Sequence, residues 1–149
     1  MSTSSVPAVR AALFDSLPGW LGADWSVFYG FPGKDVPQRF AAVSSTVDGL
    51  SREQRTLPLR QGSSRTENYG LTVILWHLER SFTSAAIRTA VESTWVAADA
   101  IDNGLRTDPS LTGLVTSALL TDYEDTDHFL NEGYASQLVL TVTVQSVRA

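Results

Sequence analysis

The residue types that could do chemistry gather in one acidic segment of the last third of the chain. This segment holds four acids and a histidine: Asp122, Glu124, Asp125, Asp127 and His128. Carboxylate oxygens at alternating positions of a strand could collect a hard cation. The spacing is not that of an EF-hand, because the sixth and twelfth positions counted from Asp122 hold Asp127 and Gly133 rather than glycine and glutamate. A solvated acidic ribbon, or an acidic wall facing a channel or a neighbouring subunit, is therefore favoured over metal binding.

The common catalytic motifs are missing from the sequence. It contains no Walker loop, no Gly-x-Gly-x-x-Gly, no His-Glu-x-x-His and no nucleophile elbow. It has no cysteine, which removes thiolate chemistry and the usual zinc ligands. His77 stands in an apolar, strand-like run, where a histidine is far more often packed and hydrogen-bonded than catalytic. We expect no catalytic residue, no cofactor and no metal, and therefore not an enzyme.

Two segments carry the periodicity of helices. The first is Val6 to Leu17, which Pro18-Gly19 is expected to end. The second is Thr83 to Leu105, where apolar residues recur at steps of three and four, and Thr83 or Ser81 can cap it. Each apolar stripe should face a sheet.

Five segments have strand-like patterns, and they are Trp25 to Phe31, Arg39 to Val47, Glu67 to Glu79, Leu111 to Leu120 running into the acidic segment, and Leu138 to Gln145. Glu67 to Glu79 is expected at the centre, because it offers apolar side chains to both faces. Asp48 to Thr66 has little periodicity and is either a loop or an extended hairpin arm. The order predicts one α+β domain over residues 1–149, with two helices and a mostly antiparallel sheet of about five strands.

Charge is distributed unevenly along a chain whose net charge is -5. From Lys34 to Arg65 there are six basic residues against three acidic ones, whereas from Asp99 to Glu132 eight acids accompany only Arg106. Such a chain can pair head to tail with its own copies, and heterologous contacts of this kind close into rings when the rotation permits. The alternative is a set of solvated loops of uneven charge. The acidic balance argues against unspecific adhesion to nucleic acid or to anionic lipid.

Several short stretches resemble the tail-terminator (tail completion) proteins of long-tailed bacteriophages. These stretches are Tyr29-Gly30-Phe31-Pro32, Leu57-Pro58, Tyr69-Gly70-Leu71-Thr72-Val73, and the helical pattern that ends in Gly104-Leu105-Arg106-Thr107-Asp108-Pro109 before two strands. The resemblance implies a hexameric ring that caps the head-proximal end of the tail tube, stops tube growth and joins the tail to the head-neck connector. Its implied partners are copies of itself, the tail tube protein and the connector protein, with double-stranded DNA passing through unbound.

The resemblance carries over regions rather than catalytic side chains. The candidate subunit or neck interface is the arginine-bearing arm, with Arg52, Arg55, Arg60 and Arg65. The candidate lumen or acidic interface is formed by Asp122, Glu124, Asp125 and Asp127. A negative lumen would repel phosphates and so keep the duplex from sticking during transit.

The start of the chain has no signal-peptide pattern, and no window approaches 18 uninterrupted apolar residues. We therefore expect a protein made in the host cytoplasm, without a membrane partner, that ends at the tail-neck junction of the virion. Two alternatives remain open. One is another neck protein, such as a head-completion or connector-stopper subunit. The other is a small α+β ligand-binding domain or enzyme, with a pocket between the long helix and the sheet lined by Trp76, Trp95 and His77.

Overall fold

The computed structural model describes residues 4–33, 36–56 and 63–148, and its elements follow the predicted order. The elements are α1 (Val6–Leu21), β1 (Ser26–Tyr29), β2 (Arg39–Thr56), β3 (Ser63–Glu79), α2 (Ser84–Thr107), β4 (Ser117–Leu130) and β5 (Gly133–Arg148). The α+β class, with two helices and five strands, is confirmed.

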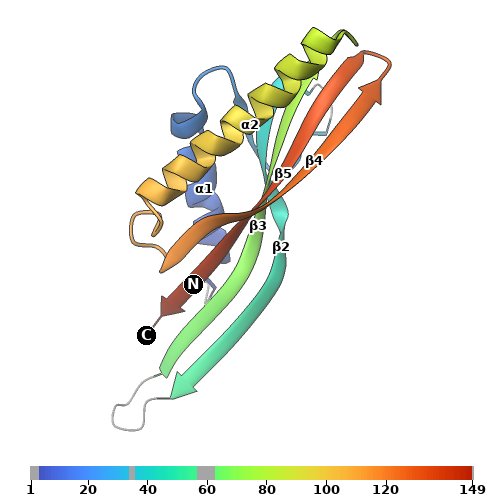
Figure 1. Ribbon diagram of the computed structural model, residues 1–149. Helices are drawn as coiled ribbons and strands as arrows, with labels where there is room; N and C mark the ends of the chain where they lie inside the picture. The colour runs from blue at the N-terminus through green and yellow to red at the C-terminus, as the bar shows by residue number, and fades with distance from the viewer. Residues whose placement is uncertain (1–3, 34–35, 57–62, 149) are drawn as a thin grey trace.

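The five strands form one sheet in the order β1-β2-β3-β5-β4. Only β1 and β2 run parallel, and the other three pairs are antiparallel, so the sheet is mixed and mostly antiparallel, as predicted. β3 lies at the centre and pairs along most of its length with β2 on one side and β5 on the other. Both helices lie against the same face of the sheet (Figure 1), which we call the covered face; the opposite one is the uncovered face.

The core lies between the helices and the covered face. Strand side chains alternate between the two faces, and every second residue in the middle of β3 and β5 is buried there. The core set is Leu71, Val73, Leu75, Leu138, Leu140 and Val142 from the strands, with Leu13, Leu17, Ile101 and Leu105 from the helices. Each such side chain contributes about 1.5–3 kcal/mol by leaving water.

α1 is longer than the sequence predicts. The pattern places its end at Pro18, but the helix continues through Pro18 to Leu21. Proline lacks an N–H and crowds the preceding turn, yet Trp20 and Leu21 gain contact with the core by continuing the helix. The helix ends at Gly22, whose φ of 87° suits glycine and whose N–H donates to the Pro18 carbonyl at 3.0 Å.

The arm region is a hairpin rather than a loop. β2 continues to Thr56 and β3 begins at Ser63, and their register runs from Arg39 opposite His77 to Thr56 opposite Ser63, with irregularities after Val43 and Asp48. Figure 1 shows these two strands projecting beyond the helix layer. We call this projection, residues 44–56 and 63–70, the arm.

The start of α1 is fastened to the base of the arm. Glu67 is buried, and its carboxylate accepts hydrogen bonds from the Ser4 hydroxyl at 2.8 Å and the Ser5 N–H at 2.7 Å. The Ser5 and Tyr69 hydroxyls lie 2.9 Å apart. Because these bonds join residues that are far apart in the sequence, they fix where the helix enters the fold.

The strand expected over Leu111 to Leu120 begins only at Ser117. Leu111 and Thr112 have φ of 49° and 59°, which is turn geometry rather than strand geometry. The Asp108 carboxylate accepts from the Thr112 N–H at 3.0 Å, and this side-chain bond extends the turn that Asp108-Pro109 starts. Leu111 is buried all the same, which explains its apolar type.

Candidate assembly surfaces

β4 is an edge strand, and it carries the acidic segment. Its register with β5 places Tyr123, Asp125 and Asp127 opposite buried residues of the covered face, and Asp122 and Glu124 opposite Thr141 and Val139. Cross-strand partners share a face. The four predicted acids therefore do not form one wall: Asp125 and Asp127 lie on the covered side at the edge, whereas Asp122 and Glu124 lie on the uncovered side.

On the covered side, β4 and α2 meet in a surface that we call the seam: Trp95, Asp99 and Asp102 of α2 with Tyr123 and Asp125 of β4. The Trp95 and Tyr123 rings stack with centroids 5.3 Å apart and an interplanar angle of 21°. The Trp95 indole N–H donates to the Asp125 carboxylate at 3.3 Å.

The seam is electronegative around these rings. The pKa of Tyr123 is raised, first by burial and then by the charges of Asp102 and Asp99, while Arg106 acts in the opposite direction. Arg106 Nε pairs with Asp102 at 3.0 Å. Within the described part of the chain, Asp99 and Asp125 form no ion pair, so their charge is left uncompensated.

Asp127 has a different role from the other acids of β4. It accepts a short hydrogen bond from the buried Tyr134 hydroxyl, and burial followed by this bond raises the pKa of that phenol. Phe129, which is 68% exposed, stacks on Phe82 with centroids 6.4 Å apart. This end of the β4–β5 hairpin thus combines a satisfied carboxylate with an exposed aromatic pair.

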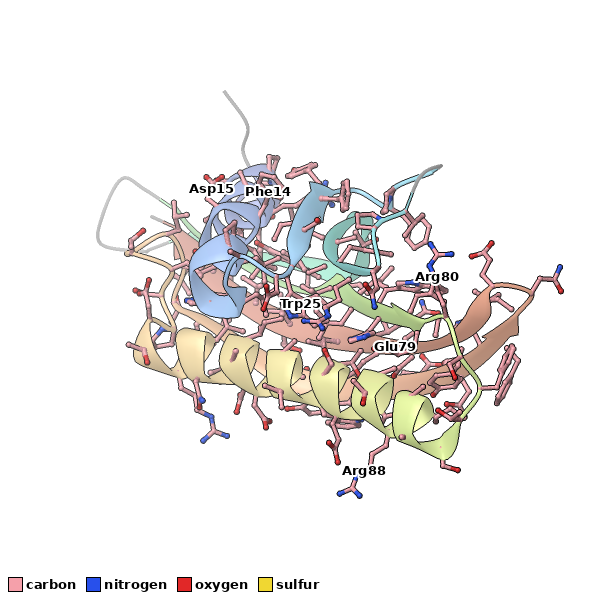
Figure 2. The ribbon with its side chains drawn as sticks, turned by 90° about the horizontal axis from the view of Figure 1, so that it is seen from above. Phe14, Asp15, Trp25, Glu79, Arg80 and Arg88 are labelled. Atoms are coloured by element: carbon pink, nitrogen blue, oxygen red, sulfur yellow. The ribbon has the colours of Figure 1, made fainter. Side chains whose placement is uncertain are left out.

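The uncovered face carries an aromatic groove at the end of the sheet opposite the arm. Phe40 of β2 lies across from Trp76 of β3, and their rings stack at 6.0 Å. Trp76 also contacts the His128 ring at 5.2 Å. The groove has a volume of about 640 Å³, and its lining consists of Phe31, Val36, Phe40, Trp76, Leu78, Arg80, Leu130 and Glu132. In the view of Figure 2, Arg80 lies on the side of the sheet away from α2, whereas Glu79 lies nearer to that helix.

The pocket suggested by Trp76, Trp95 and His77 is not formed. Neighbouring strand residues face opposite ways, so Trp76 lies in the uncovered groove while His77 is fully buried on the covered side. Trp95 stands at the seam instead. The expectation that His77 is packed and hydrogen-bonded is confirmed, because its Nε2 lies 2.7 Å from Glu79 Oε1.

The predicted arginines are placed only in part. Arg60, like Leu57-Pro58, lies outside the described residues, and for Arg52, Arg55 and Arg65 the structure describes the backbone. The three stand in the arm, where Arg52 is opposite Glu67, Arg55 opposite Ser64 and Arg65 opposite Gln54. In the sequence, residues 54–65 of this hairpin carry Arg55, Arg60 and Arg65 and no acid, whereas the edge strand β4 carries four acids.

The described residues form neither a metal cluster nor a helical membrane span. Within residues 4–33, 36–56 and 63–148, no three acidic or histidine side chains gather closely enough to hold a metal ion. No helix in the same part of the chain has the length and apolarity needed to cross a membrane.

The fold defines a class of small α+β domain in which two helices cover one face of a five-stranded sheet and a long hairpin projects from it. No protein-family model matches this chain, and no curated protein matches it. Among solved structures, a chain of the "Virion of native gene transfer agent (GTA) particle" has this fold: the match covers 97% of this chain and 100% of that chain, with a TM-score of 0.52 and 13% sequence identity. At that identity the likeness establishes a common fold.

Proposed function

We propose that the protein is a structural subunit of a phage-like particle. The observation that carries the proposal is the structural match to a chain of a virion, which covers nearly the full length of both chains. A shared fold does not by itself fix a role. The surface adds support, because exposed aromatic pairs and an acidic edge strand suit protein contacts better than chemistry.

Within such a particle, the role we propose is the tail terminator. A hexameric ring would cap the head-proximal end of the tail tube, stop tube growth and join the tail to the head-neck connector. The resemblance of the sequence motifs supports this assignment, and so does the geometry of the sheet edges. β4 offers an edge of 14 residues, while β1 covers β2 over only four residues at the other side.

Unpaired strand edges invite association, and a subunit with two different edges forms head-to-tail contacts that can close into a ring. Asp122 and Glu124 on the uncovered side are the candidates for a lumen wall, where they would repel DNA phosphates during passage. The protein then acts without catalysis and without a cofactor, and it is located at the tail-neck junction.

The test is the mass of the purified protein over a concentration series, alone and with assembled tail tubes, by sedimentation velocity and electron microscopy. The proposal expects a closed ring, free or seated at one end of the tubes. A ring that binds connectors but never tubes would instead indicate a head-completion or connector-stopper subunit. A protein that stays monomeric and ignores tubes would overturn the structural role.

The aromatic groove favours a second candidate, a small ligand-binding domain. Its volume of about 640 Å³ lies in the range of sites for small molecules, and aromatic side chains line it. A thermal-shift screen with flat apolar compounds tests this candidate. Stabilisation that disappears in Trp76→Ala would support it, and no stabilisation by any compound would count against it.

A further inference from the structure

We propose that the seam between α2 and β4 receives the arginine-bearing arm of a second copy of this chain. The inference rests on the proposed function as a self-assembling subunit, and it assigns the contact that would join neighbouring subunits. The receiving surface consists of Trp95, Asp99, Tyr123 and Asp125.

The two stacked rings of the seam are partly open to solvent. Trp95 is 37% exposed and Tyr123 is 40% exposed, although both are large aromatic side chains. The indole N–H is already engaged with Asp125 and the two rings stack on each other, so a partner meets the exposed outer part of the pair. Guanidinium groups stack on aromatic rings and pair with carboxylates beside them.

The charge around the rings is negative. Asp99 and Asp125 flank them, and neither forms an ion pair among the described residues. Arg106, the basic residue of α2 that acts on Tyr123, is engaged with Asp102. An aromatic surface with uncompensated negative charge selects a cationic partner and repels an anionic one.

The complementary charge lies in the arm. The far end of the hairpin, residues 54–65, carries Arg55, Arg60 and Arg65 and no acidic residue, whereas residues 44–53 carry Arg52 against Asp48 and Glu53. The register places Arg55 and Arg65 near the far end of the arm. The arm thus offers the charge that the seam lacks.

The arm that fills the seam must come from another copy. Asp125 is level with Leu138 and Leu75 across the sheet, whereas Ser64, opposite Arg55, lies about eleven residues further along β3. A strand segment of about eleven residues spans about 37 Å. Figure 1 shows the arm projecting away from α2, so it cannot fold back onto its own seam. Contact between two copies is then heterologous, as a ring requires.

Disulfide trapping tests the contact directly, because the chain contains no cysteine of its own. Full-length Arg55→Cys is mixed with full-length Asp99→Cys under mild oxidation, each carrying a different mass tag. The matched control replaces Asp99→Cys with Asp15→Cys, an exposed acid of α1 on the far side of the helix layer (Figure 2). The proposal expects at least about tenfold more mixed dimer with Asp99→Cys than with Asp15→Cys.

Charge exchange provides a second and independent measurement. Asp99→Lys with Asp125→Lys, or Arg55→Glu with Arg65→Glu, should each weaken self-association at least about tenfold in sedimentation velocity. The four changes combined in one chain should restore part of it, and Asp15→Lys should change nothing. Arg52 is left intact, so that the position opposite the buried Glu67 is unchanged in every variant.

The outcomes separate this inference from the proposed function. If rings form and bind tubes but neither trapping nor charge exchange depends on the seam, the inference is overturned and the function stands. If Asp99→Lys removes tube binding and leaves self-association unchanged, the seam binds the tube protein rather than a second copy of this chain. The inference is then also overturned. If the protein never associates with itself or with tubes, both fail.

Discussion

His77 is the ionisable side chain whose environment most clearly couples charge to folding. It is fully buried, its Nδ1 has no hydrogen-bond partner among the described residues, and its Nε2 meets Glu79. Burial lowers the pKa of His77, the Glu79 hydrogen bond opposes this, and the charge of Arg39 lowers it further. In the folded state the imidazole therefore gives up its proton more readily than in the unfolded chain.

The sign of the pH effect follows from that difference. Between the folded pKa and the usual value near 6.5, the unfolded chain binds more protons, so stability falls as the pH falls through this window. We expect the free energy of unfolding, measured by urea at a series of pH values, to decline below about pH 6.5. His77→Gln should flatten that decline, and an equal slope in both proteins would refute the assignment to His77.

The acids of β4 differ in what their removal should cost. Asp122→Asn with Glu124→Gln should leave the free energy of unfolding within about 0.5 kcal/mol, because both side chains are exposed. Asp127→Ala should cost about 1–3 kcal/mol, because it removes the carboxylate to which the buried Tyr134 hydroxyl donates. Urea unfolding of the two variants makes the comparison. A large loss in the first would mean that these acids have a buried or metal-bound role.

At the scale of elements, the packing of α1 on α2 depends on Gly104. A Cβ at this position would lie 2.3 Å from the Trp20 ring, so the indole occupies the space that a side chain would need. Gly104→Ala should destabilise the protein by about 1–3 kcal/mol, although alanine is the better helix former.

Gly19→Ala is the matched control, because it is also a helical glycine and a Cβ there meets nothing within 4 Å. It should be neutral or stabilising by up to about 1 kcal/mol. Thermal unfolding of Gly104→Ala and Gly19→Ala compares their stabilities. Equal behaviour would show that Trp20 moves aside without cost.

The order and type of the elements can be predicted from the sequence wherever an element buries only one of its faces. α2 and β5 show clear periods, since each has one face in the core. The sequence does not predict that α1 continues through Pro18, because there the tertiary contacts of Trp20 outweigh a local helix breaker. It also misses the bounds of β4, because exposed acids on both faces of an edge strand produce no apolar alternation.

The candidate surfaces are predictable only as regions. The acidic segment and the arginine-bearing arm are visible in composition alone. The division of the acids between two faces depends on register and on the irregularity after Leu120, which no local pattern specifies. The stack of Trp95 on Tyr123 joins residues from two elements, whereas strand alternation alone could have separated Trp76 from His77.

At the scale of the whole molecule, the arginines at the far end of the hairpin and the acids of the β4 edge make assembly sensitive to salt. Raising the ionic strength from about 0.1 M to about 1 M shortens the Debye length from about 10 Å to about 3 Å. Self-association measured by sedimentation velocity should therefore weaken over this range. Association that strengthens with salt would point to the aromatic groove and the edges of the sheet as the dominant contacts instead.

The continuity of β3 has a mechanical consequence. The same strand forms one side of the arm and the centre of the sheet, and it is bonded to β2 and β5 along nearly its full length. A pull on the arm along its axis would load these ladder bonds together, in shear, rather than peel them apart one by one. A subunit built in this way can transmit force from a neighbour into its own core without a hinge between the two.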